Sequence, residues 1–447
     1  MATPLHNPVS PEVAKTAATQ IVRTLRDAGH IAYFAGGCVR DELLGLTPTD
    51  YDVATDATPD RIAKLFPRTA HVGASFGVML VLVGRSQADG VIEVATFRAD
   101  GTYSDARRPD SVRFSTPLED AQRRDYTVNA LFLDPLEADA SKRVIDLVGG
   151  VGDLRAKRLR AVGEPALRLR EDHLRALRAV RLASRLGFEI EAATAEAIRS
   201  EAALLSGVSR ERIGDELRRM LLHPTASRAM GLLGELGLLV PVFGPVFERH
   251  PPLRAVAPGI GSYGVLAELP RDRSVSLALA AVVLEWALRG PLPLAAIDPM
   301  RVALCLSNQE TAELRAIVEC ASSILPESCV RIEPPGLGLL ALSIAGQKRA
   351  MSQPGFAAAV ALCGVAAKGN VEAMAAVERV QVQYEMLQAT PSGLSPVPLL
   401  DGAALIGLGL KPGPVFKQLL DRVYDAQLEG RVCTPEQAVA MAREHSA

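Results

Sequence analysis

The sequence has few aromatic residues and no excess of charge of either sign. Only 4% of its 447 residues are Phe, Trp or Tyr, and 49 Lys and Arg against 51 Asp and Glu give a net charge of −2. A balanced charge excludes a protein that coats nucleic acid over its whole surface, but it permits a local basic face. Hydrophobic residues make up 48% and charged residues 22%, which indicates a globular chain. The length suggests roughly two to four domains.

Zinc-type cysteine spacing, a signal peptide and a membrane span are also missing. None of the six cysteines forms a C-x-x-C pair, so we expect buried free thiols in a reducing cytoplasm, with no zinc site and no disulfide framework. The N-terminus lacks an apolar core. The longest apolar run, residues 274–288, includes Glu285 and is shorter than the roughly 18 residues of a membrane span. We therefore predict a cytoplasmic protein without a membrane partner, with Trp286 in the core.

The distribution of sequence patterns predicts an α+β fold. Short β-branched runs such as "FGVMLVLVG" and "VIEVATF" occur only within the first 150 residues, between helical segments, which predicts a small sheet. Helical periodicity dominates from residue 165 to about residue 390. The Pro- and Gly-rich segment "ATPSGLSPVPLLDG" then leads to a last small helical unit.

The stretch "GGCVRDELLGLTPTDYD", residues 36–52, carries the clearest chemistry. We expect Asp50 and Asp52 at positions i and i+2 of one strand, with both side chains on the same face. Paired carboxylates suit Mg²⁺, which also takes substrate phosphates as ligands. Two such ions about 4 Å apart can stabilise the attacking and leaving oxygens of an in-line phosphoryl displacement. A D-x-D pair alone is more often a solvated loop, so the surrounding residues matter.

The residues before the carboxylates suit a triphosphate. Gly36 and Gly37 have no Cβ, so the backbone there can approach phosphates at a helix N-terminus, where partial positive charge favours anions. Arg40 adds a cation on the first helical turn. Strand, Gly-Gly turn, helix with arginine and D-x-D strand together form a specific pattern.

With "QRRDYTVNALFLD" and "REDHLRALRAVRLASRLGF" further along the chain, this stretch resembles the class II tRNA nucleotidyltransferase and bacterial poly(A) polymerase family, among the polymerase β-like nucleotidyltransferases. The resemblance covers residues 31–222 and is recognisable again at 395–430. It implies a small β-sheet nucleotidyltransferase head followed by an all-α neck, body and tail. The implied domains are a catalytic head (1–150), a base-recognising neck (151–223), a body (224–390) and an RNA-binding tail (391–447).

The resemblance implies that CTP and ATP donate C and A to the 3′ end of tRNA without a nucleic-acid template, releasing pyrophosphate. It assigns the Mg²⁺ ions to Asp50 and Asp52. Glu93 is a candidate third catalytic carboxylate, and an ordinary strand-face acid is an equally good interpretation. The nucleotide-binding residues that it points to in the head are Gly36, Gly37, Arg40, Arg124, Asp125 and Asn129.

Base choice is predicted to lie in "EDHLR", residues 171–175. At i and i+3 of one helix, Asp172 and Arg175 would face the same way. Asp172 accepts hydrogen bonds and Arg175 donates them, which fits the amino group and ring nitrogen of C or A and not the reverse order in G or U. The resemblance adds Arg178 and Arg181. A plain surface ion pair is the alternative.

Several interpretations stay open. A poly(A) polymerase uses the same chemistry. The family's poly(A) polymerases tend to have an arginine-rich segment after the D-x-D region, and the corresponding stretch here, "HVGASFGVMLVL", is apolar, which favours the tRNA enzyme. The tRNA activity could also be limited to adding C-C or the final A. A non-catalytic RNA-binding protein is a third alternative. Asp100, Gly101 and Arg107 resemble the family's flexible specificity loop. With seven histidines and no His-Asp pair, we expect no phosphohydrolase domain, and we expect His173 at the surface or in packing. The oligomeric state is not predicted.

Overall fold

The computed structural model describes residues 10–71, 77–83, 90–101, 111–251, 253, 263–333, 338–407 and 413–445. The chain forms two compact units. The first contains residues 1–209 and 236–241, and the second contains residues 210–235 and 242–447. The boundary lies within the predicted neck, and the division into four domains remains a prediction.

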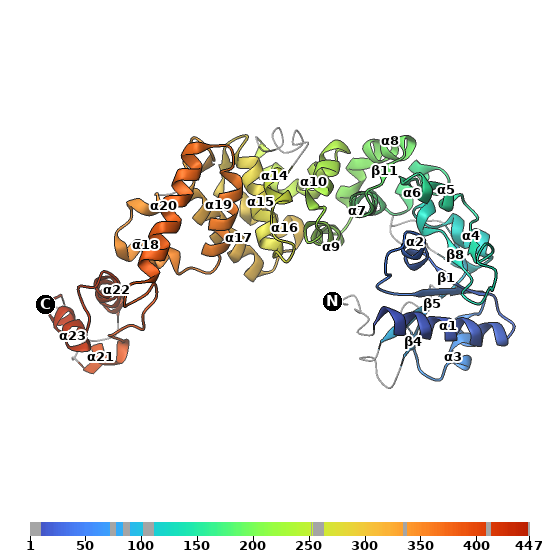
Figure 1. The fold of residues 1–447 in the computed structure, drawn as a ribbon, viewed down its shortest axis with the longest axis horizontal. Coiled ribbons are helices and arrows are strands. Elements are labelled where there is room, and N and C mark those ends of the chain that lie inside the picture. Colours follow the sequence, from blue (N-terminus) through green and yellow to red (C-terminus); the bar gives the residue numbers. More distant parts are fainter. Residues whose placement is uncertain are drawn as a thin grey trace. The chain divides into compact units, whose positions relative to one another are not determined.

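The first unit contains the predicted sheet (Figure 1). In the described residues this sheet has seven strands in the order β3-β4-β5-β2-β1-β8-β9, and only β2 and β5 pair in parallel. The strands are β1 (Ala32–Ala35), β2 (Asp52–Thr55), β3 (Thr69–His71), β4 (Val78–Leu82), β5 (Val91–Thr96), β8 (Phe132–Leu133) and β9 (Val144–Ile145). Strands β6 (Arg98–Asp100) and β7 (Val112–Phe114) form a separate antiparallel pair.

Helices with clear sequence signals surround the sheet. Helix α1 (Pro11–Asp27) begins at the N-cap Ser10 with Pro11 in its first turn, and buries Ala14, Ala18 and Leu25 along one face. The others in this part are α2 (Gly37–Leu43), α3 (Pro59–Leu65), α4 (Pro117–Gln122), the 3₁₀ turn η3 (Thr127–Asn129) and α5 (Gly150–Arg155). A cluster that includes Phe97, Phe132 and Val162 forms part of the core.

The first unit continues into helices beyond residue 157. Its remaining elements are β10 (Arg158–Leu159), α6 (Pro165–Glu171), α7 (Arg175–Leu186), β11 (Glu189–Ile190), α8 (Ala192–Glu201) and the 3₁₀ turn η4 (Ala202–Gly207). Strands β10 and β11 form a two-stranded parallel pair. Helix α7 ends where Gly187 takes a left-handed conformation at φ 69°, as helix C-termini often do.

The second unit is almost entirely helical (Figure 1). Its helices are α9 (Arg210–Leu221), α10 (Ala226–Glu235), α12 (Gly244–Arg249), α14 (Gly264–Ala267), α15 (Val275–Ala287), α16 (Ile297–Leu304), α17 (Asn308–Ile324), α18 (Ile344–Met351), α19 (Phe356–Ala366), α20 (Val371–Gln388), α21 (Gly402–Gly407), α22 (Pro414–Leu428) and α23 (Pro435–Glu444). The short helix α11 (Leu239–Val242) lies at the boundary of the two units, and β12 (Leu292–Pro293) pairs with β13 (Ile332–Glu333). The predicted α+β class is thus confirmed.

The apolar run at residues 274–288 forms α15, as expected. Trp286 on this helix is fully buried and packs edge-on against Phe243. In the described ranges, no helix combines the length and the apolar character needed to cross a bilayer. The expectation of buried thiols is wrong in part: Cys38 and Cys363 are buried, but Cys305 and Cys433 are exposed.

Candidate active site

The two aspartates of the D-x-D pair differ in how the fold holds them. Asp52 is the first residue of β2 and pairs with Ala35 of β1. Asp50 is exposed and precedes the strand, so the prediction that both belong to one strand is wrong. The strand register places Val53 beside Val94 on β5, so Asp52 and Glu93 are neighbours whose side chains share a face.

Desolvation and the neighbouring negative charges both raise the pKa of these carboxyl groups. Burial raises the pKa of Asp52 to about 7, together with the charges of Glu93 and Asp50, while Arg124 opposes this. The pKa of Glu93 is also raised, by desolvation from surrounding protein atoms and by the charge of Asp50. A cluster of like charges of this kind is stabilised by a cation.

The donor set fits Mg²⁺ bound jointly with a substrate. Asp50, Asp52 and Glu93 offer the hard oxygen ligands that Mg²⁺ prefers. Among the described side chains, no preformed group of three or more His, Cys, Asp or Glu surrounds a metal position. An open pair of carboxylates suits Mg²⁺ because this ion usually completes its shell with water and substrate phosphates.

The Gly-Gly turn lies against Arg124. Gly36 is the N-cap of α2 and has φ 78°, a backbone conformation that favours glycine. A Cβ on Gly36 would lie 3.0 Å from Nη1 of Arg124. Arg124 is held by Asp120 Oδ2, which accepts from Nη2 at 2.9 Å, and its Nη1 donates to the carbonyl of Asn129 at 3.1 Å. The structure thus brings Gly36, Arg124 and Asn129 together.

Arg40 belongs to a buried chain of polar contacts rather than to the open surface. Its Nη1 donates to Asn129 Oδ1 at 2.6 Å and its Nε to Asp41 Oδ1 at 2.8 Å. Asn129 Nδ2 donates to Asp125 Oδ1 at 3.1 Å, and Asp125 accepts from Arg178 Nη2 at 2.6 Å. This chain connects α2, η3 and α7, so residues of the predicted head and neck are positioned as one network.

The prediction that Asp172 and Arg175 lie on one helix is wrong. Asp172 is the C-cap of α6, in an extended conformation, and α7 begins at Arg175. The cause is local, because Asp172 Oδ1 accepts from the amide of Leu174 at 3.1 Å, a side-chain turn that competes with the helix. His173 lies in this break and is half-buried.

Arg175 contacts residues of its own helix pair and of the head. Its Nη1 donates to Glu171 Oε2 at 2.5 Å and to the carbonyl of Arg168 at 2.7 Å, and Nη2 donates to the carbonyl of Arg123 at 3.3 Å. Arg181 is half-buried further along α7. In the predicted flexible loop, Gly101 donates its amide to the carbonyl of Ser111 at 2.8 Å, and Arg107 lies outside the described residues.

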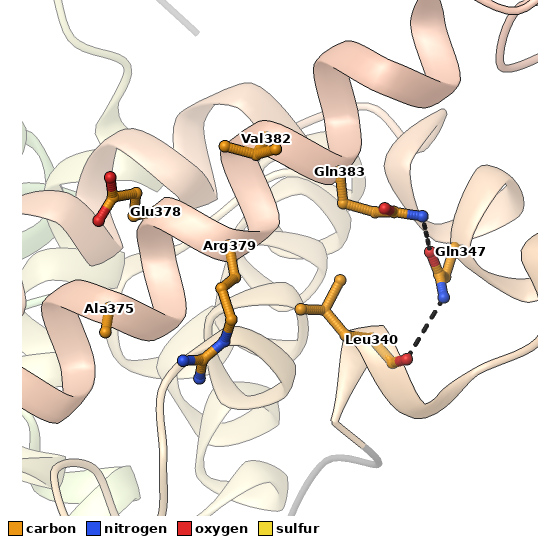
Figure 2. Close-up of a pocket in the computed structure, with 7 residues that line it drawn as sticks. All are labelled: Leu340, Gln347, Ala375, Glu378, Arg379, Val382 and Gln383. Carbon is orange, nitrogen blue, oxygen red and sulfur yellow. Dashed lines mark hydrogen bonds between the residues drawn. The ribbon is translucent and has the colours of Figure 1, made fainter.

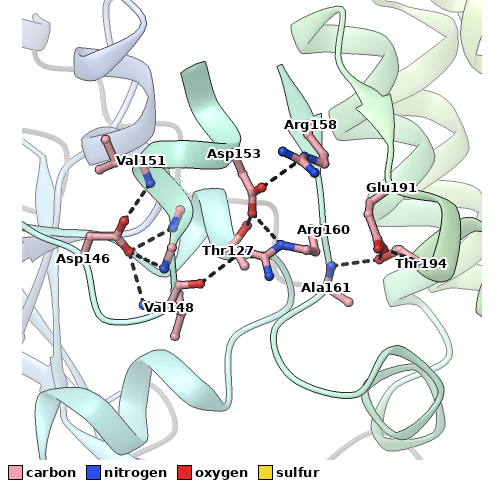
Figure 3. Close-up of polar contacts among 12 residues, drawn as sticks. Thr127, Asp146, Val148, Val151, Asp153, Arg158, Arg160, Ala161, Glu191 and Thr194 are labelled. Atoms are coloured by element: carbon pink, nitrogen blue, oxygen red, sulfur yellow. Dashed lines mark hydrogen bonds and ion pairs between the residues drawn. The ribbon is translucent and has the colours of Figure 1, made fainter. Parts of the chain in front are cut away.

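A second polar network contacts η3 through Thr127 (Figure 3). Asp153 is buried; its Oδ2 accepts from Thr127 Oγ1 at 2.7 Å and from Arg160 Nε at 2.8 Å. The carboxylate of Asp146 accepts from four successive backbone amides at the start of α5, those of Val148, Gly149, Gly150 and Val151. These contacts fix α5 against η3, which carries Asn129.

Sequence reasoning missed the acid that orients the arginine pair. Asp120 is buried and accepts from Arg123 Nε at 2.9 Å as well as from Arg124. A signal was present, since Thr116-Pro117 followed by Glu119 forms a capping box and starts a helix there. Asp120 then precedes the arginines by three and four residues, the spacing of helical ion pairs.

Arg178→Ala should lower stability in a pH-dependent way. Burial alone would raise the pKa of Asp125, but Arg178 and the amide of Asn129 hold that pKa well below its usual range. Such a depressed pKa adds stability above the unfolded pKa of about 4 and loses it as the pH falls through the folded value. We expect a loss of about 2 kcal/mol in the free energy of unfolding at pH 7.

Urea unfolding between pH 3.5 and pH 7 measures this effect. The difference between Arg178→Ala and the wild type should shrink toward the acid end, where Asp125 of the unfolded chain and of the variant takes up a proton. Lys142→Ala, which removes an exposed pair with Asp139, should change nothing measurable. A difference that stays constant with pH would contradict the role of Asp125.

The second unit contains a separate surface pocket of about 590 Å³ beside α20 (Figure 2). Its lining residues are Leu340, Gln347, Ala375, Glu378, Arg379, Val382 and Gln383. Gln347 is the buried polar residue among them, and its amide is already bonded to Gln383 and to the carbonyls of Leu340 and Leu342. We therefore assign no ligand to this pocket and place the chemistry at the carboxylates.

Comparisons with known proteins agree with this site. The sequence profile of the family described as "Poly A polymerase head domain" matches residues 32–160, which include the carboxylates, the Gly-Gly turn and Arg124. The profile described as "Probable RNA and SrmB- binding site of polymerase A" matches residues 187–250. The fold and the site thus agree with the class of protein that these two profiles describe.

A relative that matches this chain over almost its full length identifies the family. A CCA-adding enzyme of Lactobacillus delbrueckii is 33% identical over 95% of this chain and 96% of its own length. The chain belongs to the class II tRNA nucleotidyltransferase (CCA-adding enzyme) and bacterial poly(A) polymerase family. A CCA-adding enzyme of Bacillus pumilus is 45% identical over 49% of this chain, and the match spans about half (52%) of that protein.

A solved structure shows the same arrangement of elements. The crystal structure of the Bacillus stearothermophilus CCA-adding enzyme in complex with CTP has a TM-score of 0.70 and is 27% identical. The match covers 100% of this chain and 98% of that one. The fold is therefore shared along the whole chain and is not confined to the head.

Proposed function

We propose that this protein adds C and A from CTP and ATP to the 3′ end of tRNA and releases pyrophosphate. The observation that carries the proposal is the juxtaposition of Asp52 and Glu93 on neighbouring strands, with Asp50 two residues away. The full-length similarity to a CCA-adding enzyme and the CTP bound in the B. stearothermophilus structure support the choice of substrates. A cytoplasmic location and tRNA as the partner follow from this proposal.

In the proposed reaction, the terminal 3′-hydroxyl of the RNA attacks the α-phosphate of the nucleotide. Asp50 and Asp52 would bind Mg²⁺, which supplies activation of the hydroxyl and neutralises charge on the phosphates. The backbone at Gly36 and Gly37 would lie against the triphosphate at the start of α2. Arg124, oriented by Asp120, would add a fixed cation beside it.

The structure changes the proposed role of Arg40. Its side chain is buried and bonded to Asp41 and Asn129. We propose that Arg40 acts by orienting Asn129 and Asp125 near the nucleotide. Arg178 would contribute to the same orientation through Asp125.

Incorporation of labelled CTP and ATP into defined RNAs tests the function. The RNAs are tRNA transcripts that end before the first C or after C-C, and an unrelated RNA of equal length. Addition of C-C-A to the first and of A to the second is expected, with little extension of the third. Equal extension of the unrelated RNA by ATP alone would indicate a poly(A) polymerase, and a product limited to C-C or to A would indicate a partial activity. Absence of incorporation would indicate an RNA-binding protein.

Base choice by Asp172 and Arg175 remains a proposal that needs a rearrangement of Arg175. We expect Asp172→Ala to lower CTP and ATP incorporation or to admit GTP and UTP, because Asp172 lies in the break between α6 and α7 with one carboxylate oxygen on the Leu174 amide. Single-nucleotide assays with all four triphosphates measure this. Wild-type efficiency and discrimination in Asp172→Ala would refute the proposal.

Arg175→Ala is a less specific test. Arg175 also bonds Glu171 and two backbone carbonyls, so this variant should lose stability as well as discrimination. Thermal unfolding beside the assay separates the two effects. Arg170→Ala is the matched control, since it breaks an exposed pair with Glu201 near the C-terminal end of α6.

A further inference from the structure

The segment that carries Asp50 is not held by the sheet. Residues 44–51 connect α2 to β2 without regular secondary structure, and the β1–β2 register begins at Asp52. Asp50 accepts from the hydroxyl of Thr49 at 3.3 Å, a contact that moves with the segment itself. The buried residues of this segment are Pro48 and Tyr51, and Tyr51 is the one directly beside both aspartates.

Tyr51 is anchored to α2. Its side chain is buried, and its ring meets Phe34 edge-on with 5.2 Å between the ring centroids. Its hydroxyl donates to Glu42 Oε1 at 2.7 Å. The same Glu42 oxygen is 2.7 Å from Nζ of Lys15 on α1, in a half-exposed ion pair that solvent screens.

A second contact lies one helical turn earlier on α2. Cys38, four residues before Glu42 and on the same helix face, is buried, and its thiol donates to the carbonyl of Ala35 at 3.4 Å. Ala35 is the residue of β1 that pairs with Asp52. Helix α2 thus contacts Tyr51 through Glu42, and through Cys38 it contacts the residue of β1 that pairs with Asp52. The N-terminus of this helix is the Gly36–Gly37 turn proposed to meet the triphosphate.

We propose that Tyr51 and Glu42 are positioning residues that fix the metal-binding carboxylates relative to the triphosphate end of α2. The proposal rests on the nucleotidyl transfer proposed above for this site. Catalytic constellations must be held to within about 0.5 Å, and a displacement of 1 Å can cost a factor of about 10² in rate. Without the hydroxyl anchor, Asp50 would lose its fixed position.

Tyr51→Phe in the full chain tests this inference, because it keeps the ring and removes only the hydroxyl. The first readout is the affinity for Mn²⁺, measured by electron paramagnetic resonance in the absence of nucleotide and RNA. We expect the affinity for Mn²⁺ to fall about threefold to tenfold and kcat for CMP addition about tenfold, with KM for CTP within about twofold. The temperature of unfolding should stay close to that of the wild type, since Glu42 retains Lys15.

Companion variants separate positioning from general damage. Glu42→Ala should have the same effect as Tyr51→Phe. Glu42→Gln should keep most of the wild-type affinity for Mn²⁺ and most of kcat, because its amide oxygen still accepts the hydrogen bond from Tyr51. The double variant Tyr51→Phe/Glu42→Ala should be no worse than either single variant. Lys15→Ala is the control for the ion pair and should behave as the wild type.

Wild-type Mn²⁺ binding and turnover in Tyr51→Phe would overturn the inference. So would a loss of activity that follows thermal stability alone with unchanged Mn²⁺ affinity. If the wild type binds Mn²⁺ and adds no nucleotide to tRNA, the proposed function fails, and the metal-binding comparison still tests the positioning role.

Discussion

Asp52→Ala is expected to reduce nucleotide addition by about 10³-fold while tRNA binding survives, and Asp50→Ala should have a similar effect. Each change removes a carboxylate that would bind Mg²⁺ and stabilise charge in the transition state. Steady-state incorporation of CTP, beside a filter-binding assay with tRNA, measures both properties. More than about a tenth of the wild-type rate in either variant would refute the two-metal assignment.

The thermal stability of Asp52→Ala should not fall with its activity. Desolvation raises the pKa of Asp52 to about 7, with added effects of the charges of Glu93 and Asp50, so the charged form of Asp52 opposes folding at pH 7.5 in the absence of metal. Asp52→Ala should therefore leave the temperature of unfolding unchanged or raise it. Asp60→Ala, which removes an exposed acid on α3, is the matched control and should keep full activity. A large loss of stability in Asp52→Ala would mean that the lost activity reflects misfolding.

Gly150→Ala is expected to lower the free energy of unfolding by about 3 kcal/mol and nucleotide addition by at least about tenfold. A Cβ on Gly150 would lie 2.2 Å from the carbonyl oxygen of Thr127. Because this atom belongs to the backbone, the clash cannot be relieved by moving a flexible side chain. The turn η3 would have to move, and with it Asn129 and its contacts to Arg40 and Asp125.

Gly152→Ala provides the matched control on the same short helix. Nothing lies within 4 Å of a Cβ at this position, so we expect a change within about 0.5 kcal/mol and wild-type activity. Urea unfolding and CTP incorporation measure both variants. Equal behaviour of the two would show that the close approach of α5 to η3 does not matter.

The sequence predicted the fold class and the location of the chemistry. The Gly-Gly turn, the helix with Arg40, the strand at Asp52 and the change to helices after residue 165 are all local patterns, and the structure has these elements where they were expected. The apolar run around Trp286 was also predictable, because its length excluded a membrane span and its composition required burial. Hydrophobic periodicity and turn chemistry act within a few residues, so they can be read without the fold.

The sequence did not determine which partners the charged side chains contact. It suggested that Asp172 and Arg175 share a helix face, yet the Asp172 carboxylate bonds the Leu174 amide and ends α6 there. It placed Arg40 at the phosphates, whereas the fold buries this side chain against Asn129, 89 residues further along the chain. The anchor of Tyr51 on Glu42 and the neighbourhood of Asp52 and Glu93 likewise depend on strand order and helix packing. A charged side chain can satisfy its hydrogen bonds with many partners, and only the tertiary structure selects among them, because burial removes the option of water.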